Sequence, residues 1–88
     1  MELNFTLENG LYVATFTATT NFNIHIERES RGLLGILQTS VENSQYSPII
    51  DHKSLQDKIF DCDFSGVIWP KYIKIISDTE IVKCIITM

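Results

Sequence analysis

The chain has 88 residues, of which 44% are hydrophobic, and its formal net charge is −4. This length allows one domain, which we place over residues 1–88, and a domain of this size removes only about 60–65% of its unfolded surface from water. The acidic balance argues against a nucleic-acid partner, because phosphate binding requires a clustered basic surface.

The apolar stretches of the chain are too short for a membrane-spanning segment, and the start of the chain lacks the apolar run of a targeting segment. No uninterrupted run approaches the roughly 18 apolar residues that cross a bilayer. Glu2, Asn4 and Thr6 interrupt the start of the chain, so we expect no signal peptide and no membrane partner. The composition is rich in β-branched and aromatic residues, with thirteen isoleucines, eight threonines, four valines and nine aromatic residues but only two alanines. This composition favours strands over helices.

Asn9-Gly10 lies between two alternating segments and predicts a two-residue hairpin turn. With this turn, Glu8 lies opposite Leu11, and the remaining register follows by counting. The predicted pairs on the apolar side are Leu7–Tyr12, Phe5–Ala14 and Leu3–Phe16. A shift by one residue would mix the two sides, so the pattern fixes this register.

Three further strands are predicted between residues 22 and 50. Apolar and polar residues alternate over 22–27, the polar cluster 28–32 turns the chain, and 33–39 forms the next strand. Residues 41–44 indicate another turn before a short strand over 45–50. Pro48 favours a sheet edge for that strand, because proline cannot donate to a ladder.

The second half of the chain continues the pattern. Residues 51–58 are polar and form either one short helical turn or a loop, and alternation over 60–64 predicts a strand. Strands over 71–77 and 80–88 follow. Short strands with turns every eight to twelve residues predict an all-β fold, a single antiparallel β-sandwich of about seven to eight strands.

The last two predicted strands are apolar on both faces. An Asp78-Thr79 turn would place Ile75 opposite Val82 and Ile73 opposite Cys84 on one face. The opposite face would carry the hypothetical interaction surface Tyr72, Ile76, Ile81 and Ile85. Lys74 would face Lys83, an unfavourable pair. Since an exposed antiparallel face should be polar, either residues 51–58 or a second protein covers this one.

Residues with catalytic or ligand-binding chemistry are few. Cys62 and Cys84 sit in apolar stretches, and we interpret them as free core thiols, with a disulfide between them as the alternative. Asp61 and Asp63 share the outer face of their strand without the ligand spacing of a metal site.

No motif assembles these residues into an active site. His25 lies on the polar side of its strand and His52 lies in a loop, and no nucleophile motif accompanies either. We therefore expect no enzyme activity, no catalytic residue, no metal and no cofactor.

The remaining candidates for ligand binding are aromatic. Trp69, with Tyr46 or Tyr72, is the right kind of side chain to stack on sugar rings, so a glycan is the alternative partner to a protein. The competing interpretation places Trp69 in the core beneath Ser65-Gly66.

The segment IHIERESRGLLGILQTSVENSQYSPII at 24–50, with PKYIKI at 70–75, resembles small Ig-like or jelly-roll-like β-sandwiches. Such domains occur among tailed-phage virion accessory proteins, including capsid decoration and fibre-attachment proteins, and among carbohydrate-binding modules. The resemblance implies a non-enzymatic structural or assembly protein, a capsid, head-fibre or tail component that forms a homo-oligomer or larger assembly. It also implies a place in the virion after assembly in the host cytoplasm. The alternatives are a carbohydrate-binding module and a small inhibitor or regulatory subunit of an intracellular enzyme, with a cytoplasmic location as the alternative to the virion.

Overall fold

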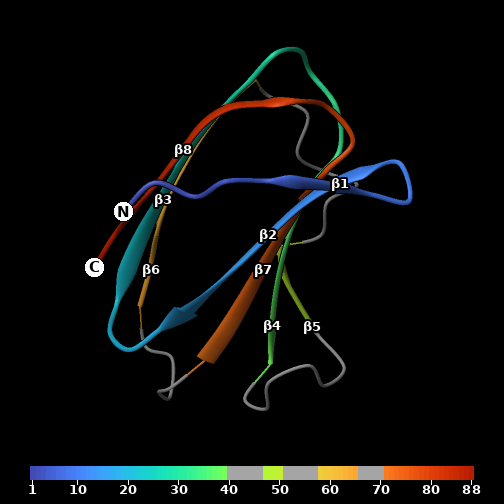
Figure 1. Cartoon of the computed structure of the whole chain (residues 1–88). Coiled ribbons are helices and arrows are strands. Elements are labelled where there is room, and N and C mark those ends of the chain that lie inside the picture. The colour runs from blue at the N-terminus through green and yellow to red at the C-terminus, as the bar shows by residue number, and fades with distance from the viewer. Residues whose placement is uncertain (40–46, 51–57, 66–70) are drawn as a thin grey trace.

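The computed structural model describes residues 1–39, 47–50, 58–65 and 71–88, and within these ranges the chain forms eight strands in two antiparallel sheets (Figure 1). The strands are β1 (Thr6–Glu8), β2 (Leu11–Ala18), β3 (Phe22–Arg28), β4 (Leu34–Thr39), β5 (Ser47–Ile50), β6 (Ile59–Phe64), β7 (Lys71–Ser77) and β8 (Ile81–Thr87). The predicted antiparallel β-sandwich of seven to eight short strands is confirmed. The prediction for residues 51–58 lies outside the described residues, apart from residue 58.

The two sheets have the strand orders β1-β2-β7-β4-β5 and β6-β3-β8. β5 lies at a sheet edge, as Pro48 predicted. The N-terminal segment, residues 1–5, runs beside β8: Glu2 bridges to Ile85, and the Leu3 amide donates to the Cys84 carbonyl over 2.9 Å. Figure 1 shows this segment beside β8 before it crosses to β1, with both chain ends close together.

The pairing is nested along the chain. The N-terminal segment pairs with β8, β2 with β7, β3 with β6, and β4 with β5. Such nesting describes one long antiparallel hairpin that has been rolled into two sheets, which is the arrangement of a jelly roll. Consecutive strands therefore often lie in different sheets.

The core lies between the sheets and is built by alternate residues of each strand. Phe16 on β2 meets the edge of the Phe22 ring on β3, with ring centroids 5.3 Å apart, and Phe22 stacks on Phe64 of β6 at 5.0 Å. The first contact joins the two sheets, and the second joins neighbouring strands of the three-stranded sheet. The other buried members of the core are Ala18, Ile24, Ile26, Leu34, Ile36, Ile73, Ile75, Cys84 and Ile86.

The N-terminal hairpin is confirmed at its turn and wrong beyond it. Glu8 pairs with Leu11 and Thr6 with Val13, and positive φ angles at Asn9 (51°) and Gly10 (81°) match a two-residue hairpin turn. The predicted partners of Leu3 and Phe5 are wrong, because the pairing of β1 with β2 ends at Thr6 and the residues near the N-terminus run beside β8 in the other sheet. Leu3 and Phe5 still pack against the core, but from the edge of the other sheet.

The predicted C-terminal hairpin is wrong. β7 pairs with β2 and β4, whereas β8 pairs with β3, so residues 78–80 lead from one sheet to the other. Lys74 lies opposite Thr15 and Leu37, and Lys83 lies opposite Glu27, so the unfavourable lysine pair does not form. Ile73 and Cys84, which were predicted to pair, face each other's sheets across the core.

Arg28 closes one end of the sandwich instead of lying in an exposed turn. It continues the inward-facing series of β3 and is 3% exposed. Its Nη1 donates to the Leu33 carbonyl at 3.0 Å and to the hydroxyls of Ser77 and Thr79 at 3.4 and 3.5 Å. A charge this deeply buried requires such acceptors, and these tie the β3–β4 connection to the β7–β8 connection.

Candidate functional site

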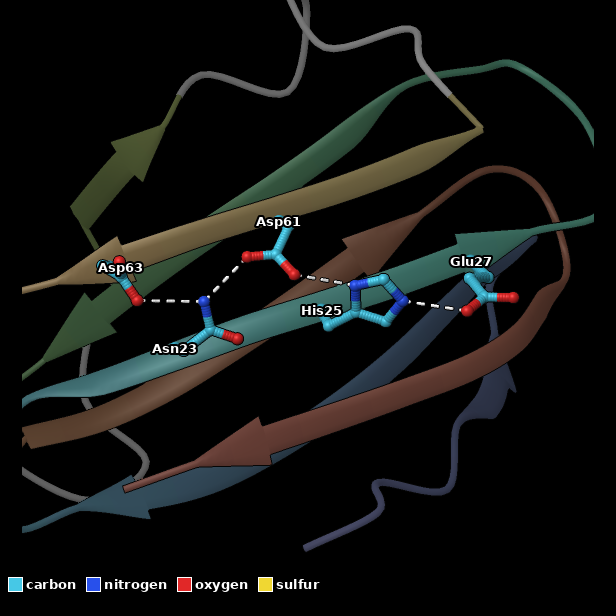
Figure 2. Close-up of polar contacts among 5 residues, drawn as sticks. All are labelled: Asn23, His25, Glu27, Asp61 and Asp63. Atoms are coloured by element: carbon cyan, nitrogen blue, oxygen red, sulfur yellow. Dashed lines mark hydrogen bonds and ion pairs between the residues drawn. The ribbon is translucent and has the colours of Figure 1, made fainter.

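The most organised polar cluster lies on the outer face of the three-stranded sheet, where β3 pairs with β6. His25 lies opposite Asp61 and Asn23 opposite Asp63. Figure 2 shows the His25 ring between two carboxylates: Nδ1 is 2.8 Å from Asp61 Oδ2, and Nε2 is 2.8 Å from Glu27 Oε2. Asn23 Nδ2 donates to Asp61 Oδ1 at 2.8 Å and to Asp63 Oδ1 at 3.0 Å. We call these five residues the polar row.

The polar row favours the protonated imidazole ring. A neutral imidazole has one N–H, so it can donate to only one of the two carboxylates. The hydrogen bonds to Glu27 and then to Asp61 raise the pKa of His25 above its ordinary value of 6.5. The hydrogen bonds from Asn23 and His25 lower the pKa of Asp61 below its ordinary value of 3.8. The ion pairs are exposed, so each contributes little to stability on its own.

These shifts predict a bounded pH range of greatest stability. The raised pKa of His25 adds stability that is complete below pH 6.5 and is lost as the pH rises through the folded-state pKa. The lowered pKa of Asp61 adds stability that is complete above pH 3.8 and is lost as the pH falls through its folded-state pKa. We therefore expect the urea midpoint to be higher at pH 5 than at pH 8.

The matched variant for this prediction is His25→Gln, which keeps a polar side chain without the titration. We expect its urea midpoint to change less between pH 5 and pH 8 than that of the unmodified chain. An equal change in both proteins would show that His25 does not produce the pH dependence.

The sheet geometry separates the residues that could have formed a catalytic pair. Cys62 lies opposite Ile24 and packs against the core, whereas His25 faces outward. The sheet therefore places the Cys62 thiol and the His25 ring on opposite faces, so they do not form a thiol–imidazole pair. Among the described residues, no group of three or more His, Cys, Asp or Glu side chains is placed to hold a metal ion.

Both cysteines are free thiols, as the sequence favoured. Burial raises the pKa of the Cys84 thiol to about 12, with a smaller contribution from the Glu2 carboxylate. Since the thiolate is the reactive form, Cys84 is chemically inert in the folded state near neutral pH.

The four residues of the predicted interaction surface do not form one surface. Tyr72 and Ile76 are half-buried on the outer face of the five-stranded sheet, whereas Ile85 lies in the other sheet between His25 and Glu2. Ile81 packs against the core. It reaches the core because β8 has an irregularity in its pairing with β3, where Val82 has no partner in the register and is 58% exposed.

An apolar surface does exist around Ile76, at the end of the five-stranded sheet nearest the β1–β2 turn. Ile76 lies between Val13 of β2 and Gly35 of β4, and the glycine contributes no side chain beside it. Leu11, two residues from Val13, shares its face, and Leu33 precedes β4. With Ser77 and Asp78, Ile76 and these two leucines line a hollow of about 50 Å³. We call Leu11, Leu33 and Ile76, together with Val13, which is only 9% exposed, the outer apolar patch.

The sequence predicts only part of the outer apolar patch. Ile76 was predicted to face outward, but its neighbours Val13 and Gly35 follow from sheet order, which the alternation does not give. Leu11 and Leu33 are 37% and 36% exposed. The candidate stacking residues Trp69 and Tyr46, together with His52, lie outside the described residues.

Comparisons of the chain with protein-family models, with curated proteins and with solved structures found no match. In the described ranges there is no helix whose length and apolar character would let it cross a membrane.

Proposed function

We propose that this chain is a non-enzymatic structural protein that joins a larger protein assembly through the outer apolar patch. The observation that carries the proposal is the exposure of Leu11 and Leu33 beside Ile76 on the face of a sheet that already has its core on the other side. Water-facing sheet surfaces are usually polar, so an apolar group there is a candidate for contact with another protein.

The size and position of the patch fit a protein partner. Each apolar side chain that is fully removed from water contributes about 1.5–3 kcal/mol, so the exposed parts of several side chains together can drive association. The hollow between Leu11 and Leu33 can accept an apolar side chain, and Asp78 provides a polar border.

We further propose that this assembly is a tailed-phage virion, in which the chain acts as a capsid decoration, head-fibre or tail-associated component. The resemblance of residues 24–50 and 70–75 to virion accessory domains supports this further proposal. The nested strand pairing adds weight, because jelly rolls are common in viral capsid domains. Jelly rolls also occur in lectins, so the fold supports a virion role only by analogy. The main support for the proposal is the outer apolar patch.

The proposal is tested with Ile76→Lys and a matched control, Val82→Lys. Both replace a surface apolar side chain by lysine, but Val82 lies on the opposite sheet and away from the patch. Assembly is measured by light scattering after size-exclusion chromatography, and by sedimentation with the particle fraction of a lysate from the infected host. Circular dichroism checks that both variants are folded.

We expect the unmodified chain and Val82→Lys to enter the same assembly, and Ile76→Lys to remain monomeric. If Ile76→Lys assembles as well as Val82→Lys, the patch is not the contact surface. If the unmodified chain stays monomeric and sediments with no particle, the structural role fails and the glycan hypothesis for Trp69 should be tested with Trp69→Ala.

A further inference from the structure

The polar row contains a feature that the proposed function does not use: one histidine between two carboxylates that come from different strands. Asp61 belongs to β6, and Glu27 belongs to β3, the same strand as His25. Both contacts are 2.8 Å long and involve different ring nitrogens. When the ring loses a proton, one of the two carboxylates must therefore face a nitrogen lone pair and lose its hydrogen bond.

The two carboxylates are not held equally. Asp61 accepts a second hydrogen bond, from Asn23 Nδ2 to Oδ1 at 2.8 Å, and so is fixed from both sides (Figure 2). In the described part of the chain, Glu27 has His25 as its one hydrogen-bonded side-chain contact. Glu27 also has the longer side chain, with one more rotatable bond, so it moves at lower cost than Asp61.

A second partner for Glu27 lies on its other side. Lys83 on β8 is directly opposite Glu27 in the register and is exposed. Residues opposite each other on one face of an antiparallel pair have Cβ atoms about 4.5–5.5 Å apart, so a glutamate and a lysine there form an ion pair readily. The other neighbours of His25 on this face offer no such alternative: Ile85 is apolar, and Glu2 beyond it is acidic.

We propose that His25 is a proton-operated clasp on the outer face of the three-stranded sheet. With both ring nitrogens protonated, it joins Asp61 of β6 to Glu27 of β3. On losing the Nε2 proton to solvent, it keeps its Nδ1–H bond to Asp61 and releases Glu27, which turns to Lys83 of β8.

The clasp changes the charge pattern of this face without unfolding it. Before release, the carboxylates of Glu27 and Asp61 both contact the imidazolium, and Lys83 lies opposite Glu27. After release, the charge on His25 is gone, and Glu27 and Lys83 neutralise each other. Asp63 is not in contact with the ring and keeps its hydrogen bond from Asn23 in both states. The hydrogen bonds to Glu27 and Asp61 raise the pKa of His25, so the release is expected above pH 6.5.

The test is a pH titration of the intact chain by NMR, which follows the ring nitrogens of His25 and the side chain of Glu27. At high pH we expect Nδ1 to be protonated and Nε2 to be bare. We also expect the contact between the Glu27 side-chain protons and the His25 ring to be lost with the same midpoint as the ring titration. A bare Nδ1 at high pH would mean that Asp61 is released instead, and a Glu27 contact that persists through the titration would mean that nothing is released; either result overturns the proposal.

Three variants separate the clasp from general surface electrostatics. Glu27→Gln and Asp61→Asn each remove a carboxylate that touches the ring, whereas Asp63→Asn removes the same charge from the same face without touching it. We expect the first two to lower the titration midpoint of His25 clearly more than Asp63→Asn does. Equal shifts in all three would show that the ring senses only the total charge of the face.

Discussion

Replacing Ile73 with alanine is expected to destabilise the domain by about 2–5 kcal/mol, because it leaves a cavity at the centre of the core. Ile73 is fully buried on β7 and faces the opposite sheet. A domain of this length has a total stability of roughly 5–10 kcal/mol, so this single change removes a large part of it. The measurement is the free energy of unfolding from urea denaturation.

Ile76→Ala is the matched control, since it removes the same atoms three residues further along the same strand. Ile76 is half-buried on the outer face, and we expect its loss to cost about 1 kcal/mol or less. If Ile76→Ala were as destabilising as Ile73→Ala, the outer face of β7 would be covered by the chain itself, and the proposed contact surface would not be available.

Replacing Arg28 with methionine is expected to destabilise the domain by about 2–4 kcal/mol, because buried acceptors lose their donor. Methionine keeps most of the length of the side chain, so the loss reports mainly on the hydrogen bonds to Leu33, Ser77 and Thr79. The change is measured as a shift in the urea midpoint at constant slope, which indicates lost stability without a change in the surface exposed on unfolding.

Arg31→Met is the control for Arg28→Met. Arg31 lies in the same connection but is exposed, and we expect its replacement to change stability by less than about 0.5 kcal/mol. If both variants changed stability equally, the hydrogen bonds of the Arg28 guanidinium would contribute nothing beyond the charge that both arginines share. Other contacts would then hold this end of the sandwich together.

Local features of the fold were predictable because they depend on neighbouring residues. The two-residue alternation gave the strands, and Asn9-Gly10 gave its turn and the pairing of Glu8 with Leu11, because a two-residue turn leaves one register. Pro48 gave an edge strand for a similar reason, since its missing N–H excludes a central position.

The partners of the strands were not predictable in the same way. Consecutive strands usually lie side by side, which made a hairpin of β7 and β8 the natural expectation. In a rolled hairpin the partners of β7 are β2 and β4, which are distant in sequence. One feature of the sequence spoke against this hairpin, because it would have placed Lys74 opposite Lys83. The observed fold instead places Lys83 opposite Glu27, a favourable pair.

The same limit applied to the functional surfaces. The outward direction of His25, Asp61 and Asp63 followed from alternation, but their meeting depends on the pairing of β3 with β6. Arg28 was expected in a turn as part of the polar cluster 28–32, whereas acceptors on Leu33, which precedes β4, and on Ser77 of β7 support its burial.

The most direct test of the functional account follows the methyl groups of Leu11, Leu33 and Ile76 with a water-soluble paramagnetic probe, first in the isolated chain and then in its assembly. We expect the probe to broaden these signals in the isolated chain but not after assembly, while Val82 stays accessible in both. Shielding of the three residues in the isolated monomer would contradict it, because the protein's own chain would then already occupy the proposed contact surface.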